Sequence, residues 1–207
     1  MPFVAALPNQ TQEAFFEGHK RAFDFISGVP KRITYDNLKP AVQKVLEGRN
    51  RQEQEAFSRL KAHYLFESDF CNPARANEKD RVENLVGYVR RNVLVPIPEV
   101  NSLEELNEIL FKWCIAEQQR TVFSESLTIR EKYQIEKTEL LALPKRPFEC
   151  CRTVTVKSTK TALVRFDTVS YSVPVAYGEK ELTLKAYVDR VDIYCQNTKI
   201  ASHRRSY

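Results

Sequence analysis

The sequence has little glycine and no long apolar run. It contains 5 glycines and 10 prolines in 207 residues, which argues against a low-complexity chain. No apolar run approaches the roughly 20 residues that a membrane-spanning helix requires. The segment Met1 to Pro8 lacks the basic start and the long apolar core of a signal peptide. We therefore expect a cytoplasmic protein with no membrane partner.

The cysteine pattern and the missing phosphate loop exclude further classes. The 5 cysteines are odd in number and have no Cys-x-x-Cys spacing, so a disulfide framework or a zinc ribbon is not expected. No glycine-rich phosphate-binding loop is present, so the chain should not bind ATP itself.

The positive charge of the chain is concentrated near its C-terminus. The net charge is +5, and residues 146–207 hold 11 Lys and Arg against 6 Asp and Glu, whereas residues 1–145 hold 21 of each kind. Such an asymmetry favours a polyanionic partner, because cations that neutralise phosphates release counterions. A basic surface that only improves solubility explains the charge equally well.

Hydrophobic periodicity in the first half predicts a sheet with a helix across it. Residues 3–8 read as the end of a buried strand, and Thr11 to Gly28 repeats apolar residues at helical spacing. A short strand is expected at 31–35, mostly helix at 40–62, a short strand at 63–68 and a helix at 79–92. A strand, helix, strand order is typical of helices packed on a sheet.

The second half divides at prolines and changes period. Pro96 and Pro98 suggest a boundary, and Ser102 with Glu105 has the spacing of a capping box that opens a helix. A second charged helix is expected at 127–142. From Thr153 apolar residues alternate over five or six short strands, which indicates a small β-barrel. We predict residues 1–97 as an α/β core, 98–145 as a helical linker and 146–207 as a basic barrel.

Two carboxylates occupy positions where a metal site could form. Asp36 follows the strand expected at 31–35, and Glu83 lies in the first turns of the helix expected at 79–92. Carboxylates beyond strand ends can share Mg²⁺, and two such ions can activate the nucleophile and stabilise the leaving oxygen of a phosphodiester. Ordinary turn chemistry at Asp36 and a favourable helix dipole at Glu83 explain the same residues without a metal.

Four segments together resemble the IstA-type transposases of bacterial insertion sequences. The resemblance runs nearly from end to end and rests on residues 8–19 (PNQTQEAFFEGH), 28–39 (GVPKRITYDNLK), 77–91 (NEKDRVENLVGYVRR) and 166–175 (FDTVSYSVPV). It implies a partial RNase H-like integrase core with an Asp-Asp-Glu triad that binds Mg²⁺ or Mn²⁺. Asp36 would be the second acid and Glu83 the third, with Glu78 and Asp80 as weaker candidates for the third.

The same resemblance implies contacts with DNA and with partner proteins. Five cations near the two acids would contact phosphates: Lys39, Lys79, Arg81, Arg90 and Arg91. The family cuts insertion-sequence ends and joins them to target DNA, acts as a multimer and works with an AAA+ helper ATPase. A homo-oligomer associated with the bacterial nucleoid is therefore expected.

Two departures from the family pattern bear on activity. The family's first Asp lies on a strand upstream of the segment that resembles residues 1–10, and these residues contain neither Asp nor Glu. An Asp stands at position 80, where the family usually has Gly. We therefore expect the fragment to be catalytically inactive alone. The alternative function is a non-catalytic DNA-binding or regulatory transposase remnant.

Overall fold

The computed structural model describes residues 1–35, 42–45, 51–53, 55–70, 80–122 and 125–207, with side chains omitted at 42–45, 51–53 and 80–85. It divides into two compact units. The first unit comprises Met1–Pro8 and Gly18–Phe148, and the β unit comprises Asn9–Glu17 and Glu149–Tyr207. Helix α1 (Gln12–Phe25) therefore contributes residues to both units.

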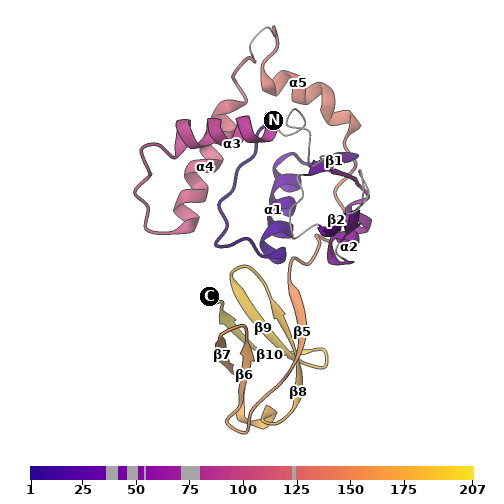
Figure 1. The fold of residues 1–207 in the computed structure, drawn as a ribbon, viewed down its shortest axis with the longest axis vertical. Coiled ribbons are helices and arrows are strands. Elements are labelled where there is room, and N and C mark those ends of the chain that lie inside the picture. The colour runs from indigo at the N-terminus through magenta and orange to yellow at the C-terminus, as the bar shows by residue number, and fades with distance from the viewer. Residues whose placement is uncertain (36–41, 46–50, 54, 71–79, 123–124) are drawn as a thin grey trace. The chain divides into compact units, whose positions relative to one another are not determined.

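A parallel strand pair in the first unit follows α1 (Figure 1). Strand β1 (Arg32–Tyr35) pairs in parallel with β4 (Glu67–Phe70), and Tyr35 lies opposite Phe70. The predicted helix at 11–28 and strand at 31–35 are thus confirmed. The short strand that was predicted at 63–68 begins later, at Glu67 of β4, because His63 and Tyr64 still belong to helix α2 (Glu55–Tyr64).

The expectation of a mostly helical segment at 40–62 is wrong. Strands β2 (Val42–Val45) and β3 (Arg51–Glu53) form an antiparallel pair there, and among the described residues of this segment the helix begins at Glu55. Lys, Gln, Glu and Arg are frequent in this stretch and favour helix, but helical propensity is a weak preference that tertiary contacts readily override.

Three helices follow in the first unit. Helix α3 (Asp80–Val93) agrees with the prediction, and α4 (Leu103–Glu117) begins at Ser102, whose Oγ accepts from the Glu105 backbone N–H at 3.1 Å. The predicted helix at 127–142 is shorter than expected. It consists of α5 (Ile129–Glu136) and the 3₁₀ turn η2 (Lys137–Glu139), and its N-terminus has the full capping box of Thr128 and Glu131.

Residues 3–8 do not form the strand end that the sequence suggested. They lie along α4, where the Asn107 side chain accepts from the backbone N–H of Ala6 at 2.8 Å and donates to its carbonyl at 3.0 Å. The side-chain amide thus replaces a strand partner, so the backbone groups of Ala6 are satisfied without a sheet.

The core of the first unit is built largely from aromatic rings. Phe23 of α1 contacts Tyr64 and Phe66 with ring centroids 4.8 and 5.8 Å apart, and Phe57 contacts Tyr35 at 5.3 Å. Such edge-to-face pairs stabilise beyond the area they bury. They hold α1, α2, β1 and β4 together, and so fix the strand end that precedes Asp36.

The β unit contains six strands, in agreement with the five or six that period-two alternation predicted. They are β5 (Arg152–Lys157), β6 (Leu163–Phe166), β7 (Val169–Ser172), β8 (Glu181–Ala186), β9 (Arg190–Cys195) and β10 (Thr198–Arg204). A 3₁₀ turn, η3 (Val175–Tyr177), precedes β8. All pairs are antiparallel, in a four-stranded sheet of order β10-β9-β8-β5 and a β6-β7 hairpin.

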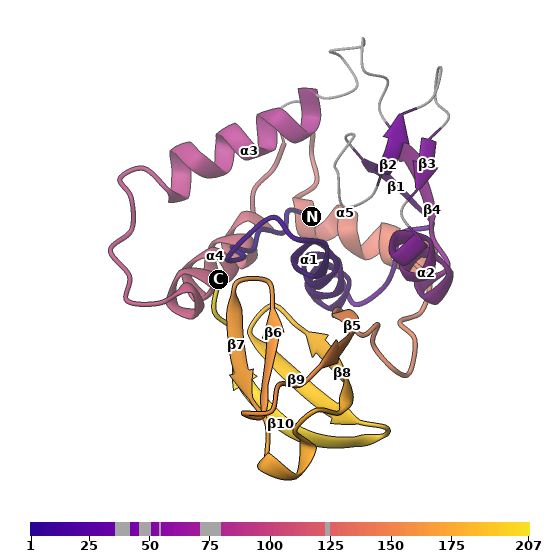
Figure 2. The ribbon, with the colours of Figure 1, turned by 60° about the horizontal axis from the view of Figure 1, so that its bottom comes forward.

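One face of the four-stranded sheet and one face of the hairpin enclose the core of the β unit, and the hairpin lies across the sheet in Figure 2. Val164 and Phe166 of the hairpin pack against Leu184, Val191 and Ile193 of the sheet. The alternation predicted from the sequence therefore places apolar side chains inward and polar ones outward.

A buried ion pair joins the two segments of the β unit. The guanidinium of Arg205 binds the carboxylate of Glu13, and the two side chains are 2% and 3% exposed. Arg205 also donates to the carbonyl of Tyr187 at 2.7 Å. Because water is excluded from both charges, removal of either partner would leave the other charge buried and uncompensated.

The fold class is therefore mixed helix and sheet, with a separate β unit, as expected in outline. No helix among the described residues is long and apolar enough to cross a membrane.

Candidate functional site

The first predicted acid follows the parallel strand pair. Strand β1 ends at Tyr35, so Asp36 comes directly after it in the chain, but Asp36 lies outside the described residues, as do Lys39, Glu78 and Lys79. In α/β sheets, binding sites form beyond the carboxyl ends of parallel strands. The strand end supports the reasoning that selected Asp36, whereas its role remains a prediction.

The second predicted acid lies on α3. The helix begins at Asp80, so Glu83 and Arg81 fall in its first turns, and the side chains of all three lie outside the described part. Arg90 and Arg91 are exposed in the last turn. Cations at this end of a helix are favoured by the helix dipole, so their position suits a phosphate contact and an ordinary solvated helix end alike.

The described side chains contain no group of three or more His, Cys, Asp or Glu residues that could hold a metal ion. The side chains of Asp36 and Glu83 lie outside this described part. The metal ligand assignment therefore stays a prediction that rests on the sequence.

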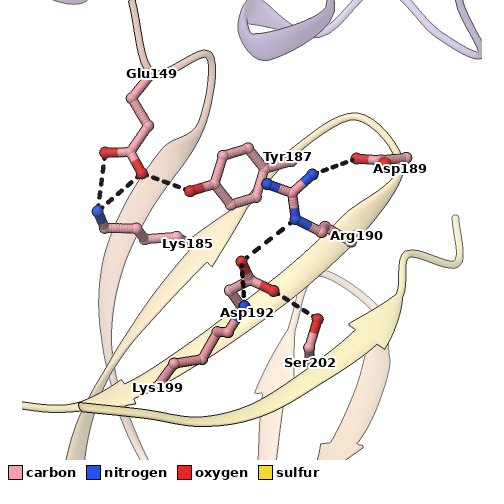
Figure 3. A network of polar contacts seen from close by, with 8 residues as sticks. All are labelled: Glu149, Lys185, Tyr187, Asp189, Arg190, Asp192, Lys199 and Ser202. Carbon is pink, nitrogen blue, oxygen red and sulfur yellow. Dashed lines mark hydrogen bonds and ion pairs between the residues drawn. The ribbon is translucent and has the colours of Figure 1, made fainter. Parts of the chain in front are cut away.

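The structure also reveals a polar network on the sheet of the β unit (Figure 3). At one end, Lys185 donates to both carboxylate oxygens of Glu149 at 3.0 and 2.8 Å, and the Tyr187 hydroxyl donates to the same carboxylate at 2.5 Å. The guanidinium of Arg190 lies 3.9 Å from the centroid of the Tyr187 ring, which links this end to the next.

At the other end of the network a buried carboxylate binds three partners. Asp192 accepts from the Ser202 hydroxyl at 2.6 Å and from Arg190 Nε at 3.3 Å, and Lys199 Nζ lies 3.8 Å from it. Only 3% of the Asp192 side chain is exposed, against 44% for Arg190 and 52% for Lys199. The carboxylate is thus covered by its own partners on the outer face of the sheet.

These contacts shift the protonation of several groups. Burial acts to raise the pKa of Glu149, but the hydrogen bonds from Lys185 and Tyr187 outweigh it and hold that pKa below the ordinary value. The hydrogen bond to Glu149 raises the pKa of Lys185. Burial, followed by the bond to Glu149, raises the pKa of Tyr187. All three groups therefore keep their ordinary charge states near neutral pH, which suits a structural network better than proton transfer.

Sequence reasoning missed this network. Arg190 and Asp192 are two residues apart on one strand, so period two alone places them on the same face. Glu149 and Lys185 are far apart in the sequence, and only the register that places Thr153 opposite Lys185 brings them together.

The first unit also contains a cavity of 790 Å³. Three aromatic rings from the N-terminal segment, α1 and α4 line it: Phe3, Phe25 and Phe111. Its lining also includes three cations and one acid: Arg21, Arg130, Lys137 and Asp24. Its size is within the range of ligand pockets.

The C-terminal part of the chain is similar to a known family of domains. Residues 143–207, which include all six strands of the β unit, match the Mu transposase, C-terminal domain. This match agrees with a separate β domain in this region.

Relatives extend the similarity to the whole chain. The transposase for insertion sequences IS1326/IS1353 of Pseudomonas aeruginosa is 35% identical over 205 residues, which are 99% of this chain and 40% of the relative. A transposase of Aminobacter aminovorans is 34% identical over 98% of this chain and 40% of its own length. The IS21 transposase of Pseudomonas aeruginosa is 29% identical over 97% of this chain and 52% of its own length.

The chain thus spans about 40% to half of the length of the relatives it matches. The resemblance that the sequence motifs indicated is confirmed: along nearly its whole length this chain is homologous to the transposases of bacterial insertion sequences.

Proposed function

We propose that this chain forms part of a DNA transposase of the Asp-Asp-Glu type, which cleaves and joins DNA at insertion-sequence ends. The observation that carries the proposal is the 35% identity to an insertion-sequence transposase over 99% of the chain. In this proposal residues 1–97 belong to an RNase H-like integrase core, 98–145 to a linker and 146–207 to a basic DNA-binding barrel.

Asp36 and Glu83 would hold the catalytic metal ions, Mg²⁺ or Mn²⁺. Their carboxylate oxygens are ligands that these hard cations prefer, and Asp36 follows a strand end held by the aromatic core of the first unit. The ions would supply activation of the attacking oxygen and stabilisation of the leaving oxygen. The carboxylates of this chain would position the ions, and Lys39, Lys79, Arg81, Arg90 and Arg91 would hold the phosphates nearby.

Metal binding can be tested without cleavage. Titration of Mn²⁺ into the whole chain, followed by electron paramagnetic resonance, should detect bound ion that decreases in Asp36→Asn and in Glu83→Gln. Glu108→Gln is the matched control, because Glu108 is an exposed acid on α4. Equal Mn²⁺ binding by the wild type and both site variants would contradict the assignment of these ligands.

DNA cleavage separates the enzyme from the alternative function. The chain carries two acids of the proposed triad, so we expect labelled insertion-sequence ends to be bound but not cut in the presence of Mg²⁺ or Mn²⁺. Specific cleavage or strand transfer would show that this chain is active alone. Salt-dependent DNA binding without Mn²⁺ binding would instead favour a non-catalytic DNA-binding or regulatory role.

Partner proteins complete the proposal. From the resemblance to IstA-type transposases, we propose that the chain assembles with further copies of itself and with an AAA+ helper ATPase, in the bacterial cytoplasm at the nucleoid. Light scattering of the purified chain with and without DNA measures the first of these associations.

A further inference from the structure

The ten cations of residues 149–207, all of which the structure describes, divide into two groups of five. The first group is engaged in ion pairs: Arg152 with Asp167, Lys185 with Glu149, Arg190 with Asp189 and Asp192, Lys199 with Asp192, and Arg205 with Glu13 and Asp167. These cations already have carboxylate partners, so a phosphate would have to compete with internal contacts.

The second group consists of exposed cations with no ion pair among the described residues: Lys157, Lys160, Arg165, Lys180 and Arg204. Three of them, Lys157, Lys160 and Lys180, belong to two segments that the backbone ties together at one end of the β unit. We call residues 157–161 and 177–181 the lysine end.

Backbone contacts bring the two segments of the lysine end together. Lys157 lies opposite Glu181 in the β5-β8 register, and the Ser158 N–H donates to the Lys180 carbonyl at 3.0 Å. The Glu179 N–H donates to the Thr159 carbonyl at 3.4 Å. The three lysines are therefore neighbours, although more than 20 positions separate Lys157 from Lys180.

The side chains of the lysine end also hold it in shape. The buried Ser158 hydroxyl donates to the Tyr177 carbonyl at 2.5 Å and accepts from the Lys180 N–H at 3.0 Å. The ammonium of Lys180 lies 5.2 Å from the centre of the Tyr177 ring. A Cβ at Gly178 would lie 3.3 Å from the Val175 carbonyl oxygen, a tight contact that glycine avoids. A preorganised surface of this kind loses less conformational entropy when it binds a ligand.

We propose that the lysine end contacts the phosphate backbone of duplex DNA, and that the ion-paired cations of Figure 3 serve the fold instead. This inference rests on the proposed function and narrows the DNA-binding surface to a few residues. The exposed hydroxyls of Thr159 and Thr161 stand beside the lysines and can donate to phosphate oxygens. Phosphate contacts of this kind carry no sequence information, so binding should be insensitive to sequence.

The test compares two triple variants of the whole chain that lose the same charge. Lys157→Gln, Lys160→Gln and Lys180→Gln remove the lysine end, and Arg152→Gln, Lys185→Gln and Lys199→Gln remove three ion-paired cations. Fluorescence anisotropy with two duplexes of unrelated sequence, over a series of salt concentrations, gives the slope of log K against log salt. Circular dichroism checks that both variants fold.

The lysine-end variant should lose about 2.7 from the magnitude of the slope, because each phosphate contact contributes about 0.9. The ion-paired variant should lose less than about 1, and both effects should be equal on the two duplexes. Equal losses in the two variants would overturn the assignment of the lysine end while leaving DNA binding intact. Absence of any salt-dependent binding by the wild type would overturn the DNA-binding part of the proposed function as well.

The acids beside the lysines provide a test of opposite sign. Glu179 and Glu181 are exposed, and both lie in the segment 177–181 of the lysine end. If phosphates approach here, Glu179→Gln and Glu181→Gln should tighten DNA binding, whereas Asp189→Asn, in the network of Figure 3, should leave it nearly unchanged. Unchanged or weaker binding in the two glutamate variants would contradict the proposal.

Discussion

Replacing Asp192 by alanine tests how the β unit holds its polar face. The variant leaves the Ser202 hydroxyl without its acceptor, and a hydrogen bond to a charged group contributes about 1.5–3 kcal/mol. Arg190 and Lys199 are 44% and 52% exposed, so water screens their ion pairs to about 0–1 kcal/mol each. We therefore expect Asp192→Ala to lower the free energy of opening of β9 and β10 by about 2–3 kcal/mol.

Amide hydrogen exchange followed by mass spectrometry measures this free energy for peptides from β9 and β10, and peptides from α4 serve as an internal reference in the first unit. Asp189→Ala is the matched control. It removes an acid that also contacts Arg190, but its side chain is 74% exposed, so the cost should stay below about 1 kcal/mol. If both variants cost the same, burial of Asp192 is not the source of the stabilisation, and the reasoning fails.

Three further perturbations test other contacts. Glu149→Gln should flatten the pH dependence of β-unit stability below about pH 4. The pKa of Glu149 is lower in the folded state than in the unfolded state, so its ionised form stabilises the fold above the unfolded-state pKa, and this stabilisation is lost as the pH falls through the folded-state pKa. Acid titration followed by circular dichroism checks this. Glu13→Ala leaves Arg205 buried without its carboxylate and should cost about 3–5 kcal/mol by exchange of β10 amides, with Glu13→Ala/Arg205→Ala costing less than the sum of the single changes. Gly28→Ala places a methyl group 2.8 Å from Leu140 Cβ and should lower the first unit's stability by about 1–3 kcal/mol, measured by Trp113 fluorescence in urea.

Apolar alternation and helix-capping residues predicted the secondary-structure elements that depend mainly on local sequence. The β unit alternates apolar and polar residues over six strands, and each inward residue such as Val164 or Ile193 is buried as its period requires. Helix α4 begins where the Ser102 side chain can bond the Glu105 N–H. In such segments the local preference and the packing agree, so the sequence alone suffices.

Contacts distant in sequence were not predictable in the same way. The β2-β3 pair replaced an expected helix, and residues 3–8 use the Asn107 amide instead of a strand partner. The strand end at Tyr35, which Asp36 follows in the sequence, could be predicted because Ile33, Thr34 and Tyr35 are β-prone. The paired cations of the β unit could not, because Glu149 meets Lys185 only through the register of two strands.

The proposals for the two units predict separable effects, because they assign different chemistry to different residues. Metal ligation is assigned to Asp36 and Glu83, whereas phosphate binding in the β unit is assigned to Lys157, Lys160 and Lys180. In the whole chain, Asp36→Asn should therefore lower Mn²⁺ binding and leave the salt slope of DNA binding unchanged, and the lysine-end variant should do the reverse. If either variant lost both Mn²⁺ binding and the normal salt slope, its substitutions would have disturbed the fold, or metal and DNA would share a site. Retention of each property in the other variant would show that metal binding and DNA binding depend on separate residues of the chain.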